Sequence, residues 1–232
     1  MRQVFRKPEK WRLSVRQFFT EAGKLVLNSI PLIALISVFI GAVLVIQTSN
    51  NMTSPFLPKM YIGYMARESL ILEFCSTMVC LILAGKIGSN ISSEIGTMRI
   101  TEQIDAMEMM GINSANFLVM PKILSTTLLN PLLTLMSFIV GLFGGYLIVA
   151  LTGMIKVSDY LQGLRFDFNG YYITYSVVKT AVFSFIISSI SSYCGYYAKG
   201  GSLGVGRSAT KAIVMASALI LIFNLILTRV ML

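Results

Sequence analysis

The stretch SEIGTMRITEQIDAMEMMG, Ser93 to Gly111, places five charged side chains between two long apolar runs. Runs on both sides approach or exceed the roughly 20 apolar residues that a helix needs to cross a bilayer. Charges are costly in the hydrocarbon core, so a polar segment held between two crossing runs is expected at a membrane surface. The stretch therefore predicts a fold of membrane spans joined by a surface helix.

The composition agrees with an integral membrane protein. Of the 232 residues, 55% are hydrophobic and only 12% are charged, and the mean hydropathy is +0.75. We expect an all-α fold with five transmembrane helices, over residues 30–47, 69–87, 123–151, 171–197 and 212–227. We further expect a single domain over 1–232, in which 1–28 form an interfacial amphipathic helix and 29–232 form the transmembrane part.

Several classes of protein are disfavoured. The chain has no histidine, which removes Ser-His-Asp and Cys-His catalysis and most zinc sites, so we expect no catalytic residue and no metal ligand. The cysteines Cys75, Cys80 and Cys194 lie in apolar runs and give no disulfide framework. The net charge is +9. The basic residues that produce it lie beside apolar spans, where such residues set topology and contact anionic lipid rather than nucleic acid.

The distribution of Lys and Arg predicts the orientation. With a cytoplasmic N-terminus, thirteen of them fall in inner segments and five in outer segments, as the positive-inside rule requires. The C-terminus then lies on the external side of the membrane. Residues 1–24 hold seven of these basic residues among aromatic and apolar ones, which predicts an amphipathic helix on the cytoplasmic face. A cleaved signal peptide fits less well, because no A-x-A-like site follows the apolar run.

Residues of the quoted stretch recur at helical spacing. One face holds Ile100, Ile104, Met107 and Gly111, and another holds Glu102, Asp105 and Glu108. We expect one short amphipathic helix that ends at Gly111, a residue suited to the C′ position. A helix lying on lipid is one interpretation. Acidic residues beside an anionic leaflet favour the other, docking into a protein partner.

Three motifs resemble those of the MlaE-type permeases, the membrane subunits of lipid-transporting ABC systems that work with MCE-domain proteins. The quoted stretch, followed by Pro121 and Lys122, is similar to the family signature. Residues 84–88, AGKIG, resemble its AGRxG motif, and residues 200–214 resemble its GGxxGVGxATTxAVV region. The resemblance covers about residues 20–230.

The resemblance implies partners and a function. Such permeases form homodimers, present a cytoplasmic coupling helix to two copies of a separate ABC ATPase subunit, and meet a hexameric MCE-domain protein on the outer side. Phospholipid occupies a cavity between the two permeases. The implied function is ATP-driven phospholipid transport between the inner and outer membranes of a bacterium. The chain would be a multi-pass inner-membrane permease and not an enzyme, with no cofactor of its own and with ATP and Mg bound by the ATPase.

The quoted stretch would then be the coupling helix. Its expected ATPase-coupling residues are Glu94, Gly96, Met98, Arg99, Glu102, Gln103, Asp105, Met107 and Gly111. Nearby, residues 201–208 imitate a P-loop with Arg207 in place of lysine. No soluble α/β domain surrounds them, so a flexible glycine turn joining the fourth and fifth spans is favoured.

Ionisable residues inside the spans are candidates for the lipid cavity. Arg67 and Glu68 lie at the outer end of the second span, while Glu73 and Lys179 reach similar depths from the outside. We expect Glu73 and Lys179 to pair with each other or to bind a lipid head group. The resemblance adds weight to Arg67, Glu68 and Lys179, and structural ion pairs or snorkelling side chains are the alternatives.

Other features of the sequence indicate function less specifically. Gln47 matches a polar position of the family and is expected at the cavity mouth or in interfacial water. The sequence departs from the family after the Arg-Glu pair, where residues 69–71 replace Leu-Gly-Pro. It departs again at Asn224, where an acidic residue is common. Gly141 and Gly145 form a G-x-x-x-G pattern that permits close helix approach.

Two other classes of function stay open. A secondary transporter or channel for an amphipathic substrate would need no ATPase, but such proteins show inverted repeats or broken spans, and the sequence shows neither. An intramembrane enzyme would need a catalytic pair within the spans, and the chain offers no histidine and no paired aspartates there.

Overall fold

The computed structural model describes residues 11–52 and 58–232, with side chains from residue 16 onward. These residues form helices and, within these ranges, no strand. Five helical runs are long and apolar enough to cross a membrane: Arg16–Asn51, Met60–Ile100, Ser114–Thr152, Tyr171–Tyr196 and Gly201–Met231. Each expected span falls within one of these runs to within one residue, so the all-α fold with five spans is confirmed.

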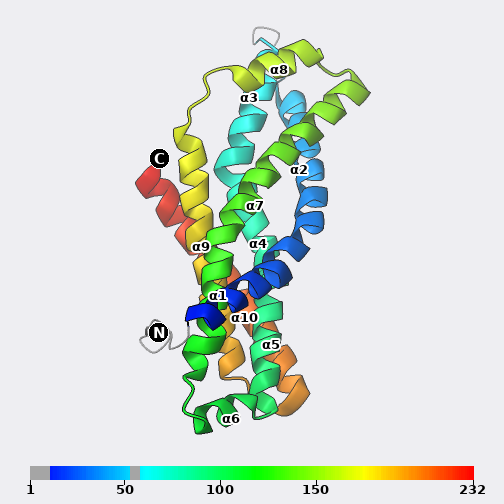
Figure 1. The fold of residues 1–232 in the computed structure, drawn as a ribbon. Helices are drawn as coiled ribbons and strands as arrows, with labels where there is room; N and C mark the ends of the chain where they lie inside the picture. The colour runs from blue at the N-terminus through cyan, green and yellow to red at the C-terminus, as the bar shows by residue number, and fades with distance from the viewer. Residues whose placement is uncertain (1–10, 53–57) are drawn as a thin grey trace. The chain divides into compact units, whose positions relative to one another are not determined.

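The helices follow one another in the order shown in Figure 1. The first run joins α1 (Trp11–Glu21) to α2 (Ile30–Asn51) through a π-helical turn (Ala22–Val26) and a 3-10 turn (Leu27–Ser29). The second run consists of α3 (Met60–Ser69), a π-helical segment (Leu70–Met78), α4 (Val79–Leu83), a second π-helical segment (Ala84–Gly88) and α5 (Ser89–Ile100). The remaining helices are α6 (Gln103–Met109), α7 (Ser114–Thr152), α8 (Val157–Arg165), α9 (Tyr171–Tyr196) and α10 (Gly201–Met231).

The glycine-rich segment before the fifth span differs from the expectation of a flexible turn. Left-handed backbone is confined to Gly200 and Gly201, with φ of 92° and 67°, and the chain is helical from Gly201 onward. Val205 is buried against Gly96 of α5, where an added Cβ would lie 3.3 Å from a Val205 methyl. This packing outweighs the low helix propensity of the glycines, so α10 begins about three turns before the expected span.

Contacts divide the chain into two compact units. Unit 1 comprises residues 1–29, 80–130 and 180–232, and unit 2 comprises residues 30–79 and 131–179. Within unit 1, α5 packs against α10 and against the C-terminal part of α9. At Gly195 on α9, an added Cβ would lie 2.7 Å from the Ser92 carbonyl oxygen. Small residues therefore bring the helices of unit 1 into backbone contact.

The helices of unit 2 also pack with their backbones in close contact. An added Cβ on Gly41 of α2 would lie 1.8 Å from the Gly141 carbonyl oxygen of α7, so the predicted G-x-x-x-G does support close packing. The sequence did not predict α8. Gly163 of α8 lies on the backbone of Met60 in α3, and the core beside this contact consists of Val45, Ile62, Ala66, Val149, Ile155 and Tyr160.

Candidate functional site

The predicted single helix over residues 93–111 is wrong. Residues 93–100 are the end of α5, which continues the second membrane run, and α6 is a separate short helix. The break falls at Thr101 and Glu102, and Glu102 has left-handed backbone with φ of 58°. Helical periodicity cannot reveal such a break, because the residues on both sides of it keep the same spacing.

The end of α6 is as predicted. Gly111 has φ of 77°, and its N–H donates to the Glu108 carbonyl over 3.0 Å. The N–H of Ile112 donates to the Met107 carbonyl, also over 3.0 Å. These two bonds form a Schellman motif with Gly111 at C′. The motif fixes where α6 stops and where the chain turns toward α7.

An ion pair holds α6 to α5. The Arg99 guanidinium of α5 donates to Asp105 Oδ1 over 2.6 Å, across the break at Glu102. The same guanidinium lies 5.9 Å from the ring centroid of Tyr196 at the end of α9. Arg99 and Asp105 were both expected to couple to a partner. In the structure they pair with each other and join α6 to α5 within unit 1.

A second clamp holds α6 to α7 and α9. The Glu108 carboxylate accepts hydrogen bonds from the Ser114 hydroxyl over 2.7 Å and from the Tyr196 phenol over 2.8 Å. These bonds, first that from Ser114 and then that from Tyr196, lower the pKa of Glu108 below its ordinary value, and Arg99 adds to the effect. Ser114 and Tyr196 were not predicted, because nothing in their sequence context links them to Glu108.

The outward side of α6 is apolar as well as charged. Met109 and Met110 are 84% and 68% exposed, and Glu102, Gln103 and Gly111 are exposed too. Ile104 is buried, while Asp105 and Met107 are half-buried. The predicted set therefore divides: Glu102, Gln103 and Gly111 lie on the free side, whereas Asp105 and Met107 lie nearer the body of unit 1.

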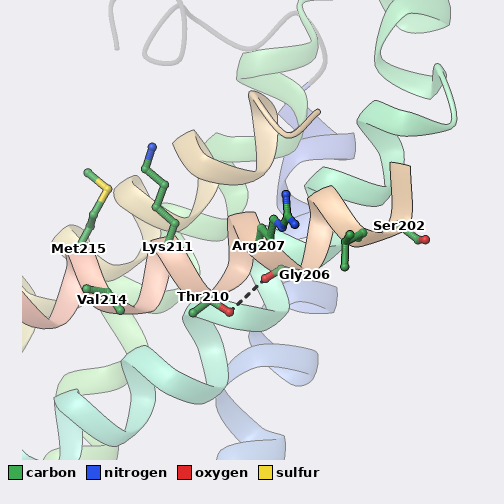
Figure 2. A pocket seen from close by; sticks show the side chains of 8 residues that line it. Ser202, Gly206, Arg207, Thr210, Lys211, Val214 and Met215 are labelled. Carbon is green, nitrogen blue, oxygen red and sulfur yellow. Dashed lines mark hydrogen bonds between the residues drawn. The ribbon is translucent and has the colours of Figure 1, made fainter. Parts of the chain in front are cut away.

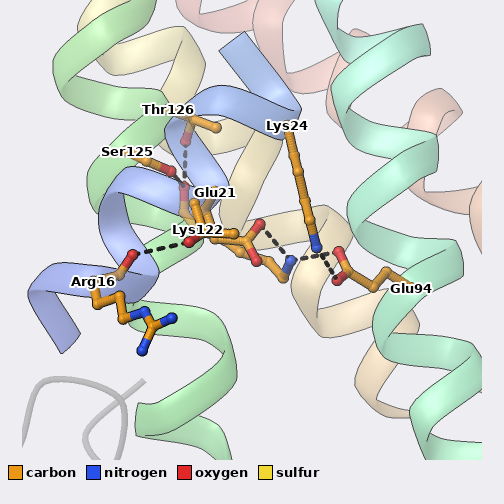
Figure 3. Close-up of polar contacts among 8 residues, drawn as sticks. Arg16, Glu21, Lys24, Glu94, Lys122, Ser125 and Thr126 are labelled. Atoms are coloured by element: carbon orange, nitrogen blue, oxygen red, sulfur yellow. Dashed lines mark hydrogen bonds and ion pairs between the residues drawn. The ribbon is translucent and has the colours of Figure 1, made fainter. Parts of the chain in front are cut away.

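The other predicted coupling residues on α5 come before Arg99 in the chain. Met98 is half-buried, and Gly96 is buried against α10. Glu94 takes part in an ion network with the N-terminal segment and α7, shown in Figure 3. Its carboxylate is therefore paired with basic side chains inside unit 1.

In unit 2, Glu73 and Lys179 form the expected ion pair. The Lys179 ammonium lies 2.9 Å from Glu73 Oε1 and donates to the Tyr175 hydroxyl over 2.9 Å and to the Leu72 carbonyl over 3.1 Å. Lys179 is 0% exposed, whereas the Glu73 side chain is 42% exposed. The pair therefore presents a carboxylate outward and a lysine inward.

Arg67 is held by a full set of hydrogen bonds. Its guanidinium donates to the carbonyls of Leu164, Phe166 and Asp167 at the end of α8, and its other donors reach Glu68 Oε1. All five guanidinium N–H groups are thus used, and the residue is 1% exposed. A cation at the C-terminus of a helix also interacts favourably with the helix dipole. The geometry favours a structural role for the Arg67–Glu68 pair.

The remaining predicted residues are exposed at the surface of the protein. Gln47 is exposed on α2. Arg207, from the P-loop-like pattern, lies on α10 beside a surface hollow of about 640 Å³ (Figure 2). In the part of the chain that the structure describes, no group of His, Cys, Asp and Glu could hold a metal ion.

Comparison with known proteins decides the family. A family model described as Permease MlaE matches residues 18–230. The chain belongs to the MlaE permease family. This MlaE-family permease is 38% identical over 201 residues to a probable ABC transporter permease protein of Rickettsia bellii (strain RML369-C), covering 87% of this chain and 77% of the relative.

Two further relatives carry more specific names. The permease is 26% identical over 205 residues to the intermembrane phospholipid transport system permease protein MlaE of Haemophilus influenzae, covering 88% of this chain and 78% of that protein. It is 29% identical over 218 residues to the chloroplastic protein TRIGALACTOSYLDIACYLGLYCEROL 1 of Arabidopsis thaliana, covering 94% and 61%. The family and the five apolar helices together indicate a multi-pass inner-membrane ABC permease, which is a transport component and not an enzyme.

Proposed function

We propose that this permease is the membrane subunit of an ATP-driven transporter that moves phospholipid between the inner and outer membranes of a bacterium. The observation that carries the proposal is the position of α6, a short helix that is clamped to three neighbouring helices and has Met109 and Met110 exposed at its end. The name of the Haemophilus influenzae relative supports phospholipid as the substrate. Family membership supports a separate ATPase as the source of energy.

The exposed side of α6 suits a protein partner better than a lipid surface. Met109 and Met110 supply flexible apolar side chains of the kind common at adaptable binding surfaces. Glu102 is an exposed carboxylate at the N-cap of the same helix, and an anionic leaflet would repel it. We therefore assign Glu102, Gln103, Met109 and Met110 to the contact with the ATPase, with Asp105, Arg99 and Glu108 holding the helix in place.

The proposed assembly contains two permease copies, two ABC ATPase subunits and a hexameric MCE-domain protein. The N-terminus and α6 lie on the cytoplasmic side, where the excess of Lys and Arg places them, and the C-terminus is periplasmic. ATP and Mg bind to the ATPase. Closure of the ATPase subunits on ATP displaces α6, and its clamps pass the movement to α5, α7 and α9.

We assign the lipid-facing role in unit 2 to the Glu73–Lys179 pair. A buried ammonium in contact with a half-exposed carboxylate can exchange that partner for a lipid phosphate at little electrostatic cost, because both are anions. Gln47 is an exposed polar residue of α2, and we assign it to the mouth of the proposed lipid cavity. Arg67 and Glu68 support the loop after α8.

The test is lipid transfer by the complex purified with its ATPase and reconstituted in vesicles. Transfer of fluorescent phospholipid is expected only with hydrolysable ATP, and a fall of at least tenfold is expected when Glu102→Ala and Met109→Ala are combined. The matched control is Asp159→Ala, which removes an acidic residue of α8 in unit 2. Transfer that continues without any ATPase subunit would instead support a secondary transporter or channel.

A further inference from the structure

Lys122 on α7 is a buried charge that the proposed coupling does not use. Its ammonium lies 2.7 Å from Glu21 Oε2 and 2.5 Å from Glu94 Oε2, and the residue is only 2% exposed. Taking an ammonium out of water is costly unless close and well-placed partners compensate it. Here the partners come from two different helices, as Figure 3 shows. The arrangement is a junction of three helices and not a snorkelling side chain.

Further contacts dock the N-terminal segment beside this junction. The Lys24 ammonium lies 3.8 Å from the second oxygen of Glu94, and the Lys86 ammonium donates to the Asn28 carbonyl. Leu25 and Val26 are buried. The segment that follows α1 is therefore packed into unit 1 and does not simply rest on lipid.

Two of the three helices in the junction, α5 and α7, also anchor α6. Glu94 lies on α5, about 7.5 Å along the helix from Arg99 at a rise of 1.5 Å per residue. Lys122 lies on α7, about 12 Å along the helix from Ser114 by the same measure. Arg99 and Ser114 are the residues that hold Asp105 and Glu108 of α6. Any displacement of α6 that reaches α5 and α7 therefore reaches two of the three helices that meet at Lys122.

We propose that Lys122 is a positioning residue that transmits the movement of α6 to the N-terminal helix through its ion pairs with Glu94 and Glu21. The inference rests on the proposed ATP-driven function and names the contacts that carry the movement. The N-terminal helix then shifts with the nucleotide state of the ATPase, as part of the transport cycle. The junction contributes to coupling and contacts neither nucleotide nor lipid.

The test compares three variants in the complex purified with its ATPase and reconstituted in vesicles of phosphatidylethanolamine and phosphatidylglycerol. Glu21→Gln removes one carboxylate charge and leaves Lys122 paired with Glu94. We expect lipid transferred per ATP hydrolysed to fall at least fivefold, with ATP hydrolysis within twofold of wild type. Lys122→Arg keeps the charge and is expected to transport at a near wild-type ratio. Lys24→Gln is the matched control, since Lys24 is exposed and its ammonium lies further from the Glu94 carboxylate than that of Lys122 does.

A second measurement reports the movement itself. Spin labels on Phe19→Cys and Leu203→Cys, both exposed and both in unit 1, give a distance between the N-terminal helix and α10. We expect nucleotide to change this distance in the wild-type background and to leave it unchanged with Glu21→Gln. A Glu21→Gln complex that keeps both the wild-type ratio and the distance change would overturn the inference. A wild-type complex that transports with ATP but shows no distance change would overturn it while leaving the proposed function standing.

Discussion

The Glu108 carboxylate of α6 accepts a hydrogen bond from the Tyr196 phenol at the end of α9, with 2.8 Å between the oxygen atoms. The two residues are separated by 88 positions in the sequence, and the bond joins the short surface helix directly to a membrane span. Ser114 completes the contact from α7. This clamp joins α6 to both α7 and α9 within unit 1.

Tyr196→Phe removes the phenol and keeps the ring. We expect the amide protons of α6 to exchange with solvent at least about fivefold faster, because the helix loses one of its anchors. Hydrogen exchange read by mass spectrometry on the α6 peptide checks this. Tyr197→Phe is the control, since Tyr197 is exposed. Unchanged exchange with Tyr196→Phe would show that the hydrogen bond does not hold α6.

The lowered pKa of Glu108 predicts a pH dependence of the same clamp. A carboxylate with a folded-state pKa below its unfolded value of 4.5 contributes stability that is present above pH 4.5. That contribution is lost as the pH falls through the folded-state value. We expect α6 exchange, corrected for intrinsic chemistry, to accelerate below pH 4.5, and the effect to vanish with Glu108→Gln. The same acceleration in the Glu108→Gln protein would assign it to another group.

Glu102 tests whether backbone or charge matters at the break between α5 and α6. A non-glycine residue in the left-handed region is strained by about 1 kcal/mol or more, so Glu102→Gly is expected to preserve α6 and to stabilise the fold slightly. Glu102→Val should lower the melting temperature in detergent, because a β-branched residue tolerates this backbone poorly. If Glu102→Val melts at or above the wild-type temperature, the left-handed backbone is not required.

Arg67→Lys is predicted to destabilise the loop after α8. Lysine has three donors where the guanidinium uses five, so at least two hydrogen bonds to a buried charge are lost, at a cost of about 2 kcal/mol or more. The melting temperature in detergent should fall accordingly, while Arg165→Lys, an exposed residue of α8, should not change it. Equal melting temperatures for both variants would contradict the structural role assigned to Arg67.

Gly41→Ala is predicted to separate α2 from α7. The new methyl group would meet the Gly141 carbonyl of the opposing backbone, which cannot move as a flexible side chain would. Overpacking of this kind costs about 1–3 kcal/mol of stability. The protein should therefore aggregate at a lower temperature on heating. Gly206→Ala on α10 is the control, because no atom lies within 4 Å of its added Cβ. A Gly41→Ala protein as stable as that control would disprove the close packing.

Lys179→Met tests the lipid-facing role of the pair in unit 2. Removing the buried ammonium leaves Glu73 without the cation that balances it, and we expect lipid transfer to fall at least tenfold. The unbalanced charge in Lys179→Met should also lower the melting temperature. Adding Glu73→Gln should restore the melting temperature, because the lone charge is gone, but should not restore lipid transfer. Lys156→Met, at an exposed position, is the control. Transfer at the wild-type rate in Lys179→Met would remove the pair from the mechanism.

The spans and two local features could be predicted from the sequence. Long apolar runs determine helices that cross a membrane, and glycine at the end of a helix predicts the C′ position, as Gly111 shows. The Glu73–Lys179 pair followed from depth alone, because both spans were expected to enter from the same side and a charge in a span needs a partner.

The other contacts of the candidate site depend on tertiary packing that sequence periodicity does not encode. The break at Glu102 interrupts a regular helical pattern without any proline or glycine to mark it. Lys122 directly precedes an expected span, where a basic residue gives no sign of a buried network, although it is the centre of one. Arg67 was assigned to a cavity because the sequence did not predict α8, whose C-terminus it binds.

The proposed coupling requires α6 to contact the ATPase. A photoreactive phenylalanine analogue in place of the exposed Met109, activated in living cells, captures whichever molecule lies against α6, protein or lipid. We expect a crosslinked product of permease and ATPase subunit, and no such product when the analogue replaces Phe39, an exposed residue of the membrane helix α2. Crosslinks from position 109 to lipid alone would show that α6 does not dock on the ATPase.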